Sequence, residues 1–152
     1  MNPDLLLKGD YQPAFEPYPI QVPEIQSGDT YYFRTRSGLE YQVKFGKKRD
    51  NYLGNIINFG VLGDEFEDEY SETNRGEIFR IISTMIEIIR IYHEHHMHSD
   101  TYEFTGEFKE TRDEQKASIR SRLYYRYARR CLNENWEPVL EGNKVIIRKL
   151  KS

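Results

Sequence analysis

Arginine and tyrosine gather in one short stretch of the chain, residues 118–132, which reads SIRSRLYYRYARRCL. A guanidinium binds phosphates or carboxylates through paired hydrogen bonds, and a neighbouring tyrosine ring can stack on a base or pack against a protein. This chemistry predicts a surface for a protein partner or for nucleic acid, made by Arg120, Arg122, Tyr125, Arg126, Arg129 and Arg130. The alternative is an ordinary solvated helix face.

The same stretch has the periodicity of an amphipathic helix. Its inward side is predicted to carry Leu123, Tyr124, Tyr127, Ala128 and Cys131, opposite Arg122, Arg126 and Arg129. Arg120 is different, because helical geometry places it within the apolar stripe, so we expect it either to emerge beyond the sheet edge or to be paired inside. Cys131, the single cysteine of the chain, excludes an intrachain disulfide and is expected to be buried.

Four histidines occur in the run HEHHMH, from His93 to His98, and imidazole is the commonest metal ligand. The zincin motif requires a histidine at position 97, where this chain has Met97. The pairs His93/His96 and His95/His98 are three residues apart and could share a metal, but a helix dipole also favours cationic histidines at a helix C-terminus. We therefore predict structural or solvated histidines and no metal site.

Acidic residues concentrate between residues 64 and 72, where six carboxylates could supply oxygen ligands to calcium or magnesium. The segment lacks the regular alternation and the glycine of an EF-hand loop, which favours a solvated loop. A nuclease site would need acidic residues that converge with a lysine, such as Glu103, Glu107 and Lys109, but an exposed strand shows the same alternation. No catalytic residue and no cofactor is predicted.

The composition is that of one polar globular domain of 152 residues, with 38% hydrophobic residues and a net charge of −3. This charge excludes a uniformly basic nucleic-acid binder, but acidic and basic residues are segregated, which predicts an electrically polarised molecule. No signal peptide or membrane-length apolar run is visible, and a lone cysteine fits a reducing compartment. We expect a protein that is cytoplasmic or associated with a virion.

The candidate functional residues are expected to lie in a single domain, residues 29–152. An extended arm, residues 1–28, precedes this domain. The arm contains five of the six prolines, and its alternating aromatic and aliphatic residues are too apolar for a free linker. The arm is therefore expected either to lie across its own domain or to dock on a partner.

Period-two patterns predict a hairpin of TYYFRTR and LEYQVKF around Ser37-Gly38, followed by the strand NIINFGVL. A helix should run from Asn74, its N-cap with Glu77 as capping-box partner, to about His96, with YEFTGEF as the next strand. The arginine helix and a closing hairpin of WEPVL and KVIIRKL around Gly142 complete the chain. The prediction is an α+β fold with a mostly antiparallel sheet and the order β-β-β-α-β-α-β-β.

This order resembles the core of the GNAT-type N-acetyltransferase fold over residues 30–150. The loop before the cofactor helix in that family has the pattern Gln/Arg-x-x-Gly-x-Gly/Ala, whose backbone amides wrap phosphates. The matching segment here is SETNRGEI, residues 71–78, in which Gly76 fits, Ile78 replaces a small residue and Glu77 opposes phosphate charge. The resemblance also implies a tyrosine general acid on the last helix, where Tyr124 stands, although its place on the apolar stripe favours a core role.

The segment from Arg122 to Arg126, with the hairpin that follows it, is also similar to the tail of small uncharacterised proteins from bacteria and tailed phages. Together these features predict a non-enzymatic binding or assembly protein, such as a structural or accessory protein of a tailed phage. Its arm and basic helix would contact a protein partner or further copies of the chain. The alternatives are an N-acyltransferase with a degenerate acetyl-CoA loop and a nucleic-acid-binding accessory protein.

Overall fold

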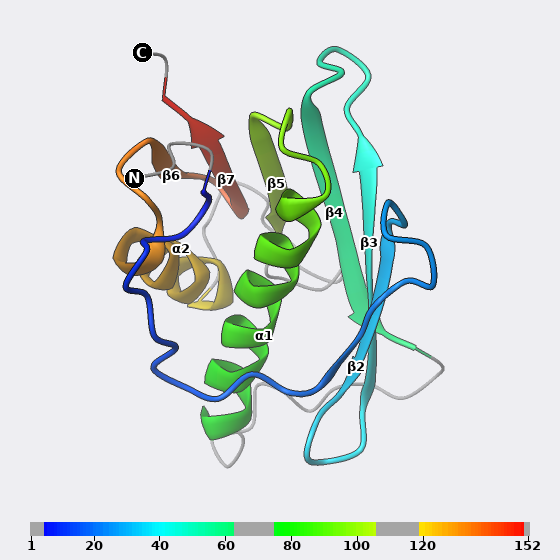
Figure 1. The fold of residues 1–152 in the computed structure, drawn as a ribbon. Coiled ribbons are helices and arrows are strands. Elements are labelled where there is room, and N and C mark those ends of the chain that lie inside the picture. Colours follow the sequence, from blue (N-terminus) through cyan, green and yellow to red (C-terminus); the bar gives the residue numbers. More distant parts are fainter. Residues whose placement is uncertain (1–4, 63–74, 106–118, 151–152) are drawn as a thin grey trace.

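The structure, a computed structural model, describes residues 5–62, 75–105 and 119–150. It confirms the predicted class, because a seven-stranded and mostly antiparallel sheet lies behind two helices (Figure 1). The elements in chain order are β1 (Ile20–Gln21), β2 (Thr30–Arg34), β3 (Glu40–Lys47), β4 (Gly54–Val61), α1 (Arg75–Glu94), β5 (Thr101–Thr105), α2 (Ile119–Cys131), β6 (Trp136–Glu141) and β7 (Lys144–Lys149). Neither helix within the described ranges combines the length and the apolar character that a membrane span requires.

The sheet has the order β1-β2-β3-β4-β5-β7-β6, and every neighbouring pair is antiparallel except β4 and β5. These two parallel strands pair only from Gly54↔Thr101 to Ile56↔Glu103, and α1 lies on the connection between them. A parallel pair needs such a crossover, whereas a tight turn joins the antiparallel hairpins. The two predicted hairpins turn at Gly38 and Gly142, whose positive φ values of 94° and 60° favour glycine.

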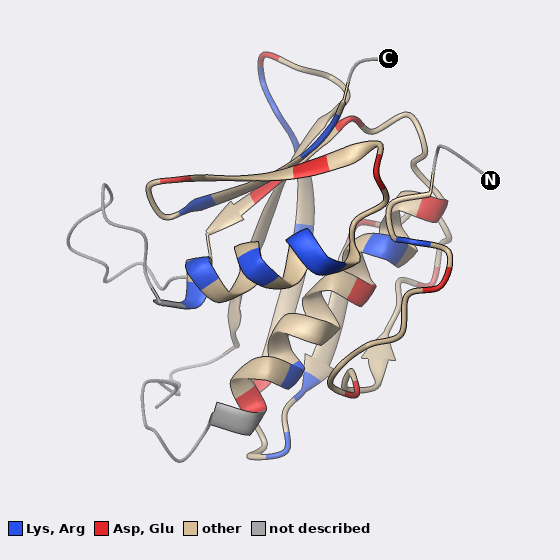
Figure 2. Cartoon of the chain, turned by 90° about the vertical axis from the view of Figure 1, so that its left-hand side faces the viewer, with Lys and Arg blue, Asp and Glu red and all other residues tan. Residues whose placement is uncertain are grey.

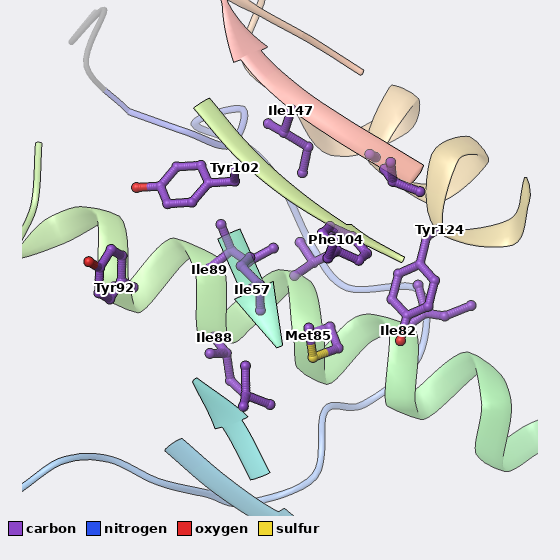
Figure 3. Close-up of a cluster of buried hydrophobic side chains, with 14 of the residues drawn as sticks. Ile57, Ile82, Met85, Ile88, Ile89, Tyr92, Tyr102, Phe104, Tyr124 and Ile147 are labelled. Atoms are coloured by element: carbon purple, nitrogen blue, oxygen red, sulfur yellow. The ribbon is translucent and has the colours of Figure 1, made fainter. Parts of the chain in front are cut away.

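The core lies between one face of the sheet and the two helices. Phe45 and Ile57 are register partners on that face, and Tyr102 and Phe104 continue it on β5. Helix α1 lays Ile82, Met85, Ile88, Ile89 and Tyr92 over this surface (Figure 3), all of them buried. The ring of Tyr92 stacks on Phe45 with 3.8 Å between centroids, which ties the end of α1 to the middle of β3.

The described part of the arm lies across its own domain, which is one of the two alternatives that the sequence left open. Leu6, Leu7 and Tyr18 are buried, and Figure 1 shows the arm passing in front of α1 and α2. Two residues of the arm form β1, a strand that the sequence did not predict, which pairs with Phe33 and Tyr32 of β2. The arm is thus a structural layer of the domain.

Polar groups of α1 hold the arm in place. The hydroxyl of Ser83 donates to the carbonyl of Phe15 at 2.6 Å, and the amide of Tyr18 donates to the hydroxyl of Thr84 at 2.8 Å. The Arg80 guanidinium lies 3.9 Å from the centre of the Tyr18 ring, a cation–π contact. These contacts explain why Ser83 and Thr84, polar residues within a long helix, are both buried.

The ends of α1 differ in part from the prediction. The helix begins at Arg75, as expected for Asn74 as N-cap, but Asn74 lies outside the described residues. Glu77 accepts a hydrogen bond from the backbone amide of Ser37 at 2.7 Å, so its carboxylate ties α1 to the β2–β3 turn. The helix ends at Glu94, not at His96, and two successive i+3 backbone hydrogen bonds, His95 to Tyr92 and His96 to His93, close the turn that follows.

Candidate functional site on helix α2

The predicted basic surface lies on α2, and four of its arginines are exposed: Arg122, Arg126, Arg129 and Arg130. Figure 2 shows basic positions spaced along the outward side of this helix. Tyr125 is partly buried between them, with the Arg129 guanidinium 5.8 Å from its ring centre. The structure thus places Tyr125 and these four arginines on one accessible surface, named here the arginine face.

Arg120 does not belong to the arginine face. Only 4% of its surface is exposed, so including it in the predicted interaction surface was wrong. The reason is geometric, because Arg120 precedes the buried residues Tyr124 and Ala128 at intervals of four and therefore points inward with them. Of the two positions that the sequence left open for Arg120, the interior is the one observed.

The inner side of α2 fixes the direction in which the arginines point. The ring of Tyr124 packs edge-on against Phe104 and Phe59, with centroids 5.1 and 5.9 Å away. The hydroxyl of Ser121 donates to the carbonyl of Asn143 at 2.7 Å, which ties the first turn of α2 to the β6–β7 turn. As predicted, Tyr124, Ala128 and Cys131 are buried, and the opposite side of the helix is left to the arginines.

Three of the four arginines of the arginine face lack a carboxylate partner among the described residues. Other arginines in the described part of the chain form ion pairs, including Arg34 with Glu40, Arg90 with Glu87, and Arg148 with Glu137. Within those same ranges Arg126, Arg129 and Arg130 have no carboxylate within ion-pair distance. Three guanidiniums on two turns of helix therefore present an uncompensated positive charge.

A pocket of about 340 Å³ opens beside these arginines, where the arm crosses α2, and is named here the arm–helix pocket. Its walls are made largely by Tyr11, Ala14, Phe15, Phe79, Leu123 and Tyr127. Arg126 and Arg130 also line the pocket, and no acidic residue is among its described lining residues. The arginine face and the pocket therefore form one continuous site, part basic and part apolar.

Two hydrogen-bonded tyrosines join the arm to α2 in this pocket. The hydroxyls of Tyr11 and Tyr127 lie 2.7 Å apart, and Tyr127 donates to Ser83 of α1 at 3.2 Å. Burial and the bond to Tyr127 raise the pKa of Tyr11 well above its ordinary value, so the Tyr11 hydroxyl stays protonated at pH 7. The two tyrosine hydroxyls of the pocket wall are thus used by each other and by Ser83.

Comparison with protein-family models, curated proteins and solved structures finds no match for this chain. What the arginine face and the pocket can bind therefore follows from their own chemistry. The sequence prediction found the arginines but missed the arm and α1 residues of the pocket, above all Tyr11, Phe15 and Phe79. The sequence signal for Tyr11 and Phe15 was that aromatic residues alternate with prolines in the arm, and no such signal pointed to Phe79.

The histidine run does not converge on a common point. His93 is buried, and its Nδ1 lies 2.6 Å from the hydroxyl of Tyr102, whereas Nδ1 of His96 lies 2.9 Å from the carbonyl of Tyr92. His95 and His98 are exposed. In the ranges that the structure describes, no group of three His, Cys, Asp or Glu residues could hold a metal ion. His93 thus belongs to the core, where it also packs edge-on against Trp136 at 5.1 Å.

The other residues considered for catalysis are engaged or lie outside the described ranges. The carboxylate of Glu103 is almost buried and bridges Lys48 at 2.9 Å and Lys144 at 3.5 Å. Glu107, Lys109 and the acidic stretch 64–72 lie outside the described residues. Tyr124, the residue that the acetyltransferase resemblance implies as a general acid, is 1% exposed and packs as a core aromatic.

Proposed function

We propose that this chain is a binding protein whose arginine face recognises an acidic surface or segment of a protein partner. The observation that carries the proposal is the exposure of Arg126, Arg129 and Arg130 without a carboxylate partner in the described chain. Guanidiniums bind carboxylates through paired hydrogen bonds, and interfaces are enriched in arginine and tyrosine. The arm serves this function by completing the pocket, since its Tyr11, Ala14 and Phe15 line it.

A protein partner is favoured over nucleic acid by the balance of charge. The whole chain carries a net charge of −3, and the exposed arginines of α2 are four: Arg122, Arg126, Arg129 and Arg130. Nucleic-acid binding draws its affinity from many phosphate contacts, so an acidic molecule with a few free arginines would be repelled over most of a long polyanion. A short acidic protein segment needs only the arginine face.

Reversing charge at the arginine face tests the proposal. We expect the double variant Arg126→Glu/Arg130→Glu to bind a fluorescently labelled hexaglutamate peptide at least about 10-fold more weakly than the wild type, since two charge-assisted contacts become repulsive. The matched control is Lys44→Glu/Arg49→Glu, which makes the same change in net charge at two exposed residues away from α2. Fluorescence anisotropy at 50 mM salt provides the dissociation constants, and this control should change the affinity less than about 2-fold.

The same titration separates the competing explanations. An equal loss in both double variants would mean that the peptide responds only to net charge, which contradicts a defined site. Stronger binding of a single-stranded oligonucleotide of matched charge, with affinity that falls steeply with salt, would favour the nucleic-acid alternative. Absence of peptide binding at 1 mM protein would reject the proposal itself.

A second candidate function, N-acyl transfer, rests on the sheet order. The single parallel pair β4–β5, with α1 on its crossover inside an antiparallel sheet, supports the resemblance to the GNAT-type fold. Two observations weigh against a working cofactor site. The Glu77 carboxylate near the N-terminus of α1 would repel phosphate, and Tyr124, the implied general acid, is buried. Binding therefore remains the preferred function.

Thermal denaturation with acetyl-CoA distinguishes the two functions. A ligand at 100 times its Kd stabilises a protein by about 2.7 kcal/mol, a shift of several degrees in Tm for a domain of this size. For a binding protein we expect no shift at 1 mM acetyl-CoA beyond that produced by ATP, which controls for polyphosphate attraction to the arginines. A shift specific to acetyl-CoA would support the acyltransferase.

A further inference from the structure

We propose that the arm–helix pocket takes one aromatic or branched aliphatic side chain of the acidic partner, while flanking acidic residues contact Arg126 and Arg130. This inference rests on the proposed function, and it defines the partner more closely as an extended acidic segment with an apolar anchor. The pocket is assigned a role distinct from that of the arginines, because it selects a side-chain shape whereas the arginines select charge.

The walls of the pocket match an apolar side chain. The rings of Phe15 and Phe79 stack with 4.8 Å between centroids and form one side, and Leu123 contributes from α2. A volume of about 340 Å³ is at the low end for ligand pockets, enough for a single phenyl or leucyl group. Phe15 remains 38% exposed at the pocket, so apolar surface is left for such a group to cover.

The rim of the pocket matches flanking carboxylates. Arg126 and Arg130 are one helical turn apart, about 6 Å along the axis, and both are exposed. In an extended peptide, residues i and i+2 are about 6.6 Å apart and point to the same side, while residue i+1 points to the other. An apolar anchor that enters the pocket therefore has the acidic residues two positions before and after it on its own side, where Arg126 and Arg130 also line the pocket.

The chemistry of the pocket also favours a side chain over a nucleobase. The hydroxyls of Tyr11 and Tyr127 are hydrogen-bonded to each other, and that of Tyr127 also to Ser83. Against the apolar wall of Phe15, Phe79 and Leu123, a base would bury ring nitrogens and carbonyl oxygens without partners, which costs about 1–3 kcal/mol for each unsatisfied group. A phenyl or leucyl group has no polar atoms to satisfy. The anchor is thus apolar, and charge recognition stays at the rim.

Two peptides that differ only in the anchor test the proposal: acetyl-Glu-Glu-Phe-Glu-Glu-amide and acetyl-Glu-Glu-Ala-Glu-Glu-amide. The wild type should bind the Phe peptide at least about 10-fold more tightly than the Ala peptide in isothermal titration calorimetry. The variant Ala14→Trp, at an exposed residue of the pocket wall, should reduce this preference to less than about 2-fold and leave binding of the Ala peptide unchanged. The control Gln26→Trp adds the same side chain at an exposed arm position outside the pocket and should keep the preference.

Each of the other outcomes contradicts one part of the proposal. Equal binding of the two peptides, weakened by Arg126→Glu/Arg130→Glu, overturns the pocket anchor and leaves the proposed function standing. Absence of binding by both peptides overturns the proposed function as well. Residues 64–70 of the chain itself read DEFEDEY, so the chain's own segment is the competing occupant. If the Phe peptide binds only the variant Phe66→Ala, the chain's own segment occupies the pocket. If light scattering finds a dimer that Ala14→Trp dissociates, a second copy occupies it. Either result contradicts the proposal of an external partner.

Discussion

Deleting residues 1–18 is expected to lower the free energy of unfolding by at least about 5 kcal/mol, or to prevent folding altogether. The deletion removes the buried side chains Leu6, Leu7 and Tyr18, and burial of each such side chain contributes about 1.5–3 kcal/mol. It also removes the hydrogen-bond partners of Ser83 and Thr84, which are buried beneath the arm. Domains of this size are typically stable by about 5–15 kcal/mol, so the loss is a large part of the total.

Single substitutions keep this expectation measurable if the truncated chain does not fold. Leu7→Ala should lower the free energy of unfolding by about 2–5 kcal/mol in chemical denaturation followed by circular dichroism. The matched control Ile25→Ala lies in the same arm at a side chain that is 70% exposed, and it should change stability by less than about 0.5 kcal/mol. An unfolding midpoint of the truncated protein equal to that of the full chain would contradict the structural role of the arm.

The surface that the arm contacts could not be predicted from the sequence. The prolines of the arm predicted extended backbone, and its alternating apolar residues predicted contact with some surface, but local pattern cannot say which surface. The answer depended on Ser83 and Thr84, which in a helical sequence indicate a solvent-facing side. They are buried because the carbonyl of Phe15 and the amide of Tyr18 satisfy them across 68 and 66 positions of sequence. No helical or strand periodicity carries that information.

The two helices and the strands from β2 onward were predictable for the opposite reason. In β3, Tyr41, Val43 and Phe45 alternate with more exposed residues. In α1, Ile82, Met85 and Ile89 recur at helical spacing. In both elements the local pattern alone therefore predicts which side is buried. Arg120 shows the limit of the same rule. Its spacing from Tyr124 indicated the inward side correctly, but charge alone had grouped it with the arginine face. The pocket is assembled by three separate segments, and no local pattern indicates that these segments meet.

Alkaline pH is expected to destabilise the fold strongly, through tyrosines that burial keeps protonated. Desolvation raises the pKa of Tyr31 from 10.0 to about 12, with smaller contributions from the nearby Tyr92 and Asp29. Burial is also the main cause of the raised pKa values of Tyr102 and Tyr92. In the unfolded chain these phenols ionise near pH 10, so above that pH the unfolded state binds fewer protons than the folded state.

The contribution of these buried tyrosines to stability is therefore complete below pH 10 and is lost as the pH rises toward 12. Because the unfolded chain gains the ionisation that the fold prevents, each buried phenol lowers the free energy of unfolding by roughly 1 kcal/mol at pH 11 relative to neutral pH, and Tyr31 and Tyr102 together by roughly 2–3 kcal/mol. Urea denaturation at pH 8, 10 and 11 measures this loss. Absorbance at 295 nm should show that these phenols ionise only together with unfolding.

A pair of Tyr→Phe variants isolates the cause. Tyr31→Phe removes one buried phenol, and we expect it to recover roughly 1 kcal/mol of the loss between pH 8 and pH 11, because the unfolded state no longer gains that ionisation. Tyr52→Phe is the matched control, since the Tyr52 side chain is 86% exposed and meets water in both states. Equal loss of stability in the wild type and in Tyr31→Phe would mean that groups other than Tyr31 dominate the alkaline transition. A smaller loss in Tyr31→Phe alone would tie that transition to the aromatic core beneath α1.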